Sequence, residues 1–335
     1  MKRRHPATTS VSRITAALAV VLLTTILNGC GNGAPPPKAL TKEVVVTNWF
    51  AEPEHGGLYA ALEKGFYKDN GLDMTIEPGG PQVSSILQVT SGKANFGMAQ
   101  GDELLVARKE GIPVVGIFAD FQKDPQAIMY HSGKPLQSFN DLSGRTVYVA
   151  QGAMYWEYLK KAYKLNNVKE MAFTGNYTGF INDSNAAIQS YTTSDPYIFK
   201  TKNVDVQFLP VYDSGYRPYA NVLFTTEKII KEKPEVVKAF VEATAKGWTY
   251  YKTGYEEINP VIHKINPEIS LDSMKATAES EMDLIFSGDA VKGGVGTMTE
   301  ERWMDLAKQL VAIGIIPNTD EVKHVFTTKF IPKPE

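Results

Sequence analysis

The chain has 335 residues, and its 35 basic against 37 acidic side chains give a formal net charge of −2, which argues against a nucleic-acid partner. Hydrophobic residues make up 43% of the chain and charged residues 21%, a composition typical of a globular protein and not of a disordered or collagen-like one. The single cysteine excludes an intramolecular disulfide, a thiolate zinc cage and an iron–sulfur cluster.

Residues 1–29 have the layout of a lipoprotein signal peptide. Their basic side chains precede a weakly polar to apolar run over residues 14–27, and no acidic residue occurs before Cys30. This run is shorter than the about 20 residues that span a bilayer, but it is typical of the apolar region of a secretory signal. It ends in LNGC, which resembles the lipobox of bacterial lipoproteins. The sequence therefore predicts lipidation at Cys30, with plain secretory cleavage as the alternative.

Residues 30–41 are expected to form a lipidated tether. Residues 31–38 (GNGAPPPK) are rich in Gly and Pro, which favours a flexible and then polyproline-stiffened spacer. Without residues 1–29 the chain keeps 31 basic against 37 acidic side chains, a net charge of −6. No later stretch approaches about 18 apolar residues, so the lipid would be the only membrane attachment. We therefore expect a cell-envelope protein that faces the periplasm or the cell exterior.

Beyond the tether, short apolar runs alternate with amphipathic stretches, which predicts an α/β fold with parallel sheets. The first set of units comprises strands at 43–48, 72–77, 94–99 and 113–119 and helices at 58–68, 83–91 and 102–111. A second set resembles a second lobe, with a strand at 146–150 and a helix near 155–163. Strands at 203–209 and 221–225 lead to helices at 235–252, 271–286 and 299–312. Trp248 and Trp303 lie on apolar faces of these helices and are expected in the core.

The most characteristic block of the chain is residues 49–61 (WFAEPEHGGLYAA), followed by residues 63–67 (EKGFY) and 70–73 (NGLD). With these blocks, the chain resembles the solute-binding lipoproteins of ABC importers over roughly residues 43–286. Its branch looks like the one that binds thiamin-precursor aminopyrimidines and is related to fungal pyrimidine synthases and aliphatic-sulfonate binders. Supporting blocks common to the wider superfamily are residues 91–97 (SGKANFG), 101–103 (GDE), 108–113 (RKEGIP), 121–126 (FQKDPQ) and 195–197 (DPY).

The resemblance implies a two-lobed periplasmic-binding-protein fold whose lobes close on the ligand about a hinge of two crossing strands. We place the crossings near residues 128–131 and 221–225. The expected first lobe comprises residues 42–128 and 223–335, the latter with the C-terminal helices, and the second lobe comprises residues 129–222. A ligand that touches both lobes favours the closed state by its differential affinity for that state.

Aromatic residues near the ends of strands are candidates for stacking on a planar ligand. Trp49 and Phe50 follow the first strand, at the edge where open α/β sheets present ligands. Stacking on a planar ring contributes on the order of 1 kcal/mol beyond area burial. Tyr155 and Trp156 open a helix of the second lobe and could serve from the opposite wall. In each pair, one residue is expected to face the ligand and the other to pack in the core.

Polar candidates follow the first-lobe strands. His55, Gly56 and Gly57 stand at a helix start, where His55 could donate to a ligand oxygen and the two glycines allow a ligand to approach closely. The alternative role of His55 is that of a capping or edge histidine. Gln100 and Gln122 follow strand ends and are expected to add hydrogen bonds to the ligand.

Asp195 precedes Pro196 and Tyr197, at a place where the resemblance implies that a carboxylate contacts the ligand. Relatives more often carry Glu there, so the shorter Asp changes the reach. A carboxylate accepts the N–H donors of an aminopyrimidine with charge-assisted strength. The alternative is a turn residue before proline. Tyr216, in a loop of the second lobe, is a further candidate.

Binding is favoured over catalysis. The chain has no GxSxG motif, no P-loop, no paired histidines and no cysteine after Cys30, and its histidines lack metal-ligand spacing. We therefore expect no metal and no cofactor. An acidic chain without a cluster of cations near the site disfavours anionic ligands, although Lys123 and Arg217 keep a sulfonate possible.

The expected function is that of the extracytoplasmic solute-binding component of an ABC importer, which acts as a monomer with a permease as its partner. The favoured ligand is a thiamin-precursor aminopyrimidine, either formylaminopyrimidine or hydroxymethylpyrimidine. A riboflavin-like ligand and an aliphatic sulfonate are the alternatives within the same role. An enzyme like the pyrimidine synthases is the alternative from another class.

Overall fold

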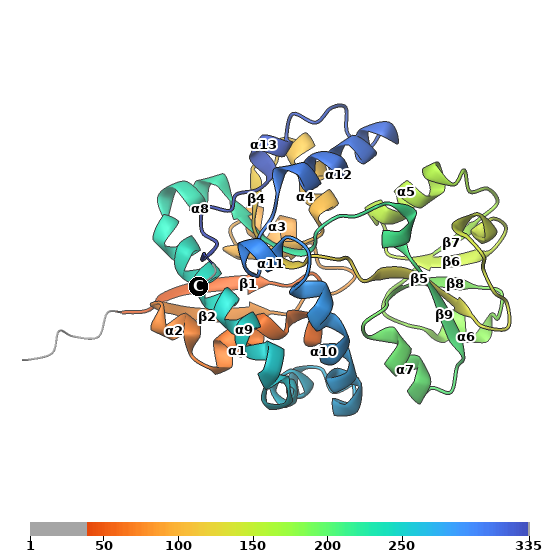
Figure 1. Ribbon diagram of the computed structural model, residues 1–335, viewed down its shortest axis with the longest axis horizontal. Coiled ribbons are helices and arrows are strands. Elements are labelled where there is room, and N and C mark those ends of the chain that lie inside the picture. The colour runs from red at the N-terminus through yellow and green to blue at the C-terminus, as the bar shows by residue number, and fades with distance from the viewer. Residues whose placement is uncertain (1–38, 334–335) are drawn as a thin grey trace, which may run out of the picture. The chain divides into compact units, whose positions relative to one another are not determined.

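Two five-stranded sheets, each flanked by helices, form the two lobes of the protein in the computed structural model, which describes residues 39–333 (Figure 1). The signal peptide, Cys30 and the tether up to residue 38 lie outside the described residues. Within the described part, no helix is long and apolar enough to cross a membrane.

The first lobe is built on a sheet with the strand order β2-β1-β3-β10-β4. Its strands are β1 (Thr41–Val46), β2 (Leu72–Glu77), β3 (Phe96–Ala99), β4 (Val114–Phe121) and β10 (Ala220–Thr226). Strand β1 pairs in parallel with β2 and β3, whereas β10 is antiparallel to both of its neighbours. Strand β4 is buried along its whole length, as its apolar sequence predicts.

The helices of the first lobe come from both ends of the described chain. They are η1 (Pro53–His55), α1 (Gly56–Glu63), α2 (Phe66–Asp69), α3 (Ser85–Thr90), α4 (Gly101–Lys109), α8 (Glu227–Glu232), α9 (Pro234–Ile265), α10 (Leu271–Ile285), α11 (Ala290–Gly293), α12 (Glu300–Ala312) and α13 (Val322–Val325). Trp248 of α9 and Trp303 of α12 are fully buried, which confirms their expected place in the core. Helix α9 continues past Pro260 and ends later than predicted, because Ile258 and Ile262 extend its buried face.

Small residues let α1 and α9 approach each other closely. A Cβ added to Gly57 would lie 2.4 Å from the ring of Trp248, and one added to Gly247 would lie 2.0 Å from the carbonyl oxygen of Gly57. No side chain larger than hydrogen fits at either position without moving a helix. This contact fixes α1 and the preceding motif against the longest helix of the lobe.

The second lobe carries a sheet with the order β7-β6-β8-β5-β9. Its strands are β5 (Gln126–His131), β6 (Thr146–Val149), β7 (Lys169–Ala172), β8 (Ala187–Tyr191) and β9 (Val206–Pro210), and its helices are η2 (Phe139–Leu142), α5 (Met154–Ala162), α6 (Thr178–Asn182), α7 (Asp195–Thr201) and η3 (Val211–Ser214). Strands β6, β7 and β8 are parallel, and β5 is antiparallel to β8 and β9.

The expectation of fully parallel sheets is wrong for one strand in each lobe. Strands β10 and β5 are the antiparallel ones, and each is the strand by which the chain enters its lobe from the other. A strand that arrives from another lobe has no crossover helix behind it. The rule that makes consecutive strands parallel therefore does not apply to it.

The chain passes between the sheets at residues 122–125 and again at residues 211–219. The segments expected to cross, 128–131 and 221–225, instead lie inside β5 and β10 of a single sheet each. Their apolar runs are strand interiors, which bury both faces, so the passages fall in the polar and turn residues beside them. The division into moving lobes at residues 128 and 222 stays a prediction.

Candidate functional site

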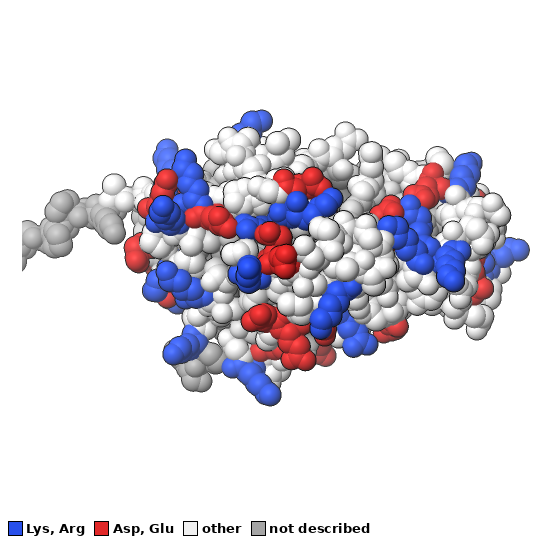
Figure 2. Space-filling model, turned by 90° about the horizontal axis from the view of Figure 1, so that it is seen from above, with Lys and Arg blue, Asp and Glu red and all other residues white. Residues whose placement is uncertain are grey.

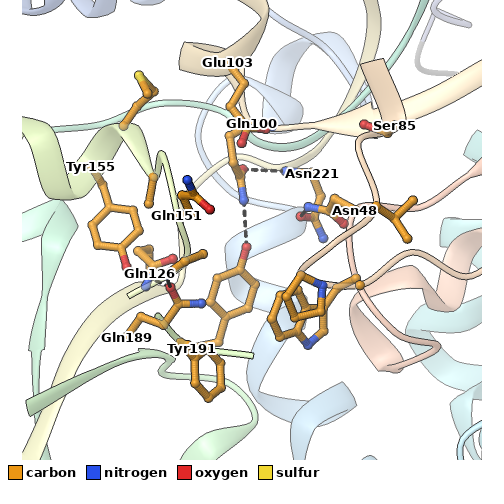
Figure 3. Close-up of a pocket in the computed structure, with 18 of the residues that line it drawn as sticks. Asn48, Ser85, Gln100, Glu103, Gln126, Gln151, Tyr155, Gln189, Tyr191 and Asn221 are labelled. Carbon is orange, nitrogen blue, oxygen red and sulfur yellow. Dashed lines mark hydrogen bonds between the residues drawn. The ribbon is translucent and has the colours of Figure 1, made fainter. Parts of the chain in front are cut away.

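A cavity of about 660 Å³ lies between the lobes, at the carboxyl ends of parallel strands from both sheets. The first lobe contributes Asn48 and Trp49 after β1 and Gln100 after β3, while the second lobe contributes Gln151 after β6 and Tyr191 at the end of β8 (Figure 3). Open α/β sheets bind ligands at this edge. The volume falls within the about 300–1,000 Å³ typical of small-molecule pockets.

Gln100 joins the two lobes across this cavity. Its side-chain Nε2 donates to the Tyr191 hydroxyl at 2.9 Å, and its Oε1 accepts the backbone N–H of Asn221 at 3.1 Å (Figure 3). Its own backbone N–H donates to Glu103 Oε2 at 2.9 Å, in a capping box at the start of α4. The sequence-predicted Gln100 is therefore held rigidly at the cavity wall and links the first lobe to the second.

A second polar chain runs along the first-lobe wall. Asn48 Nδ2 donates to Asn221 Oδ1 at 2.9 Å, and Asn48 Oδ1 lies 3.2 Å from His55 Nε2. Burial lowers the pKa of His55 to about 3, so the imidazole is neutral and carries a single N–H. Because an amide oxygen can only accept, this N–H is used by Asn48. His55 lines the cavity as predicted, but it has no second N–H to donate to a ligand.

The lining of the cavity is acidic. Among the described residues, seven carboxylate side chains line it, and no Lys or Arg does. They are Glu52, Glu54, Asp102, Glu103, Glu110, Asp124 and Asp195. The outer surface differs, because on the face shown in Figure 2 Lys and Arg side chains are interspersed with Asp and Glu. The acidic character therefore belongs to the cavity and is not an extension of an acidic surface.

Burial sets the electrostatics of these carboxyl groups. It raises the pKa of Asp195 to about 7 and that of Asp124 to about 7, and it raises the pKa of Asp102 to about 6. Hydrogen bonds oppose this effect. Asp195 accepts from the Tyr177 hydroxyl at 2.8 Å and from the Tyr191 backbone N–H at 2.9 Å. Near neutral pH the ligand-free cavity therefore holds part of its carboxyl groups in the protonated form.

Aromatic rings from both lobes form one wall of the cavity. Trp49 lines the cavity and stacks on Phe173 of the second lobe, with ring centroids 6.0 Å apart and planes 19° apart. Tyr177 lies beside Phe173, with ring centroids 5.3 Å apart. Tyr155 lines the opposite part of the cavity, and its hydroxyl donates to Gln189 Oε1 at 3.2 Å. The structure thus brings together Trp49, His55, Gln100, Tyr155 and Asp195 of the predicted set.

The second members of the predicted aromatic pairs do not line the cavity. Phe50 is 40% exposed and packs edge-on against Trp49, with ring centroids 5.4 Å apart. Trp156 is buried in the core that lies under α5. Adjacent residues in a turn or helix point in different directions, so one ring of each pair faces the cavity and its neighbour does not.

The remaining four predicted residues support the site from outside. Gly56 and Gly57 are covered by the rings of Tyr251 and Trp248, so their small size serves helix packing and not the approach of a ligand. Gln122 donates to the Thr297 backbone carbonyl at 3.0 Å and does not line the cavity.

Tyr216 lies behind an acidic lining residue. It is fully buried, stacks on Tyr158 with ring centroids 4.5 Å apart, and donates its hydroxyl to Asp102 Oδ2 at 2.5 Å. It therefore orients Asp102, which does line the cavity, without lining the cavity itself.

Several lining residues were not predicted from the sequence: Asn48, Glu52, Glu54, Asp124, Gln126, Gln151, Gln189 and Tyr191. Glu52 and Glu54 lie inside the characteristic block at residues 49–61, in which the predicted ligand contacts were the aromatic, histidine and glycine residues. Asn48 and Tyr191 occupy strand ends, and this position alone is the signal that could have found them. Gln126 and Gln189 sit within strands, where the sequence gives no sign of which polar side chain faces the other lobe.

Metal-ligand geometry is not found in the described part of the chain. No group of three or more His, Cys, Asp or Glu side chains there is arranged to hold a metal ion.

Two lobes that enclose a cavity between the carboxyl edges of their sheets define the periplasmic-binding-protein class of folds. The periplasmic aliphatic sulphonate binding protein SsuA from Escherichia coli superposes with a TM-score of 0.63, at 10% identity over 90% of this chain and 96% of that protein. The periplasmic nitrate-binding protein NrtA from Synechocystis superposes with a TM-score of 0.62, at 12% identity over 87% of each chain. The predicted fold class is confirmed.

The chain belongs to the NMT1/THI5 like family, which matches residues 52–257. The riboflavin-binding protein RibY of Chloroflexus aurantiacus is 24% identical over 320 residues, covering 89% of each chain. The formylaminopyrimidine-binding protein of Halalkalibacterium halodurans is 22% identical over 290 residues, covering 84% of this chain and 88% of that one. A Candida albicans 4-amino-5-hydroxymethyl-2-methylpyrimidine phosphate synthase is 28% identical over 229 residues, covering 62% of this chain and 67% of that one. The predicted resemblance is confirmed.

Proposed function

We propose that this protein is the extracytoplasmic solute-binding component of an ABC importer and that it captures a planar, amino-bearing heterocycle, with formylaminopyrimidine or hydroxymethylpyrimidine as the best candidates. The observation that carries this proposal is the interlobe cavity, which combines an aromatic wall with carboxylates and has no Lys or Arg among its described lining residues. Carboxylates accept hydrogen bonds from exocyclic amino groups, and aromatic rings stack on flat heterocycles.

Anionic ligands fit this lining poorly. A buried sulfonate or nitrate needs positive charge or several N–H donors around it, and the described lining offers carboxylates instead. The two cations that kept a sulfonate possible lie elsewhere. Lys123 and Arg217 both pack over the ring of Tyr212, at 4.9 Å and 4.6 Å from its centroid. The fold shared with sulfonate-binding and nitrate-binding proteins therefore does not extend to their ligands.

Riboflavin is the second candidate, favoured by the similarity to a riboflavin-binding protein over most of the chain. The cavity volume accommodates a larger ring system than a pyrimidine. The isoalloxazine edge carries carbonyl acceptors beside its imide N–H, and these acceptors find no cationic donor among the described lining residues. The amino-bearing heterocycle is therefore preferred.

Binding without catalysis is part of the proposal, although the family also contains proteins named as synthases. The support comes from the residues themselves. No Lys lines the cavity among the described residues, and the sequence contains no cysteine beyond Cys30. The polar lining residues are carboxylates, amides and hydroxyls that suit recognition, and no described nucleophile is paired with the buried, neutral His55.

The proposed cellular setting follows from the first 38 residues. We expect signal-peptide cleavage before Cys30, lipidation of that cysteine, and a monomer that delivers its ligand to a membrane permease. Mass spectrometry of the protein from the membrane fraction tests the first two points. A Cys30→Ser variant should lose the mass of the lipid, and a lipid mass that persists in this variant would contradict lipidation at Cys30.

The ligand is tested by a thermal-shift screen of a soluble chain that begins at Gly31, against hydroxymethylpyrimidine, riboflavin, taurine and nitrate. A ligand at about 100 times its Kd adds about 2.7 kcal/mol of stability, which raises Tm by several degrees. The proposal predicts a shift with hydroxymethylpyrimidine. A shift with riboflavin alone would support the second candidate, and a shift with taurine or nitrate alone would overturn the argument from the acidic lining.

A further inference from the structure

Glu54 is a buried carboxylate in the cavity wall that has no hydrogen-bond partner among the described residues. It lies in η1, between Pro53 and His55, and its side chain is 3% exposed. Neither of its oxygens has a partner at hydrogen-bond geometry among the described residues, although the hydroxyls of Ser194 and Thr193 and the Glu52 carboxyl lie near them. Both oxygens are covered by surrounding atoms, and the residue lines the cavity. A carboxylate removed from water without a partner is strongly destabilising for a folded protein. Glu281 of α10 is also buried with both oxygens unpartnered, but of the two residues only Glu54 lines the cavity, where a bound ligand would complete it.

Asp195 and Glu54 differ in how far their carboxylate oxygens are engaged by the described chain. Both oxygens of Asp195 are already engaged, Oδ1 by the Tyr177 hydroxyl and Oδ2 by the Tyr191 backbone N–H. The sequence pointed to Asp195 as the ligand carboxylate, but its hydrogen-bonding capacity is partly used by its own lobe. Glu54 lines the same cavity, and neither of its oxygens has a partner at hydrogen-bond geometry among the described residues.

No positive charge among the described residues is found to act on Glu54. The titratable groups that act on or around it are Glu52 and His55 on its own segment, Asp195, Tyr177 and Tyr191 of the second lobe, and Glu281 and Tyr251 of α10 and α9. All are acids or hydroxyls except His55, which is neutral. Burial raises the pKa of Glu54 and that of Glu52, the direction expected where no cation offsets the carboxylates.

We infer that the ligand of this cavity presents a positively charged N–H edge, such as an amidinium or a protonated aminopyrimidine, and that Glu54 is the residue that selects this charge. The inference rests on the proposed function, because it assigns the charge of the heterocycle held in the same cavity. A carboxylate and a planar amidinium match in geometry, since two parallel N–H donors meet two oxygens. Trp49 and Tyr177 add ring faces that attract a cation.

A pair of probes of equal shape and different charge tests the inference. Benzamidine is a planar aromatic amidinium, and benzamide is its neutral counterpart. Calorimetric titration of the mature protein should give benzamidine an affinity about tenfold or more above that of benzamide, because only the former supplies the missing charge. Equal affinities, or a preference for benzamide, would overturn the inference without any variant having been made.

Glu54→Gln then assigns the preference to this residue. The variant should lose most of the preference for benzamidine, whereas Glu63→Gln, which changes an exposed glutamate of α1, should keep it. Ligand-free Glu54→Gln should also melt at a higher temperature than the natural protein, because an amide costs less to bury than a carboxylate. A lower Tm together with an unchanged preference would show that Glu54 has a structural role only.

Hydroxymethylpyrimidine, titrated in parallel, separates this inference from the proposed function. If it binds while the benzamidine preference is absent or survives in Glu54→Gln, the inference fails and the proposed function stands. If benzamidine is preferred through Glu54 but hydroxymethylpyrimidine does not bind, the charge assignment stands and the proposed ligand is wrong. If none of the three compounds binds, both are overturned.

Discussion

The two lobes have similar sheet topologies but differ in what covers their sheets. In the first lobe, α9 alone is 32 residues long, and Trp248, Tyr251 and Trp303 are fully buried. The longest helix described in the second lobe, α5, has nine residues, and its edge strand β7 is exposed along its whole length. Buried apolar surface is the main source of stability, so the first lobe is the firmer of the two.

The side chains that line the cavity also differ between the two lobes in how firmly they are held. The first lobe supplies Glu54, Asn48 and Gln100, which are held by a hydrogen-bonded wall and by the packing of α1 on α9. The second lobe supplies Tyr191 and the aromatic residues near α6 from its lighter elements. We interpret this difference as functional. The first lobe is the more rigid one and positions the acidic groups that select the ligand, and the second lobe, which has fewer and shorter helices, closes over the ligand.

The largest expected effect is a loss of stability in the first lobe. In Gly57→Ala, the added Cβ would lie 2.4 Å from the Trp248 ring, so α1 or α9 must move. We expect a loss of about 2–3 kcal/mol in the free energy of unfolding, measured by urea titration. Gly133→Ala in the second lobe is the matched control, because nothing lies within 4 Å of its added Cβ. Similar stabilities for the two variants would contradict the close helix contact.

The acidic cavity should make the ligand-free protein pH-sensitive. Burial raises the pKa of Asp124 and of Asp195 to about 7, so the folded state holds these protons more tightly than the unfolded chain, where the pKa is about 4. This contribution is complete below the unfolded pKa and is lost as pH rises through the folded pKa. From about pH 4 to pH 7, stability should fall, on the order of 3 kcal/mol for each carboxyl group.

Urea unfolding at several pH values measures this dependence. Asp124→Asn should flatten the fall, because the amide does not titrate, whereas Asp73→Asn on the surface of β2 should leave it unchanged. A stability that rises steadily over this interval would show that the cavity carboxylates are compensated by partners.

The aromatic wall connects the two lobes and is tested by Trp49→Ala. Removing this ring abolishes its stack on Phe173 and one flat face of the cavity, so ligand affinity should fall roughly tenfold, about 1.4 kcal/mol. The half-buried side chain contributes less to the core, so the ligand-free Tm should change little. A Tm lower by many degrees would instead place Trp49 in the structural core.

The smallest effect is expected at the hydrogen bond between the lobes. Tyr191→Phe removes the hydroxyl that accepts from Gln100 and should weaken ligand binding by about 1 kcal/mol, roughly fivefold, because the closed arrangement loses one bond. Tyr255→Phe, which removes a hydroxyl bonded to the exposed Glu279, serves as the control. Tighter binding by Tyr191→Phe would mean that the Gln100 bond competes with the ligand.

Much of the fold could be predicted from the sequence because its signals are local. Alternating apolar runs and amphipathic stretches predicted most of the strands and the long C-terminal helices, and the block at residues 49–61 predicted the family. The antiparallel direction of strands β5 and β10 was not predicted, because strand direction depends on which lobe the chain comes from and not on the residues of the strand.

The candidate site was predicted in part for the same reason. Trp49, Gln100 and Asp195 follow or neighbour strand ends, a position that the sequence reveals, and all three line the cavity. Gly56 and Gly57 have an equally conspicuous position, but α9, almost 200 residues further along the chain, covers them. The sequence offers no sign of such a distant partner.

The sequence by itself determined the strands, the helices and the family of this protein, because these follow from residue periodicity and from contiguous motifs. The tertiary structure alone decided which charged side chains are buried and which of them are paired. Asp195 and Glu54 lie 141 positions apart and line one cavity, yet the first accepts two hydrogen bonds and the second has no partner at hydrogen-bond geometry among the described residues. Burial and pairing are properties of the space around a side chain, and that space is assembled from both lobes.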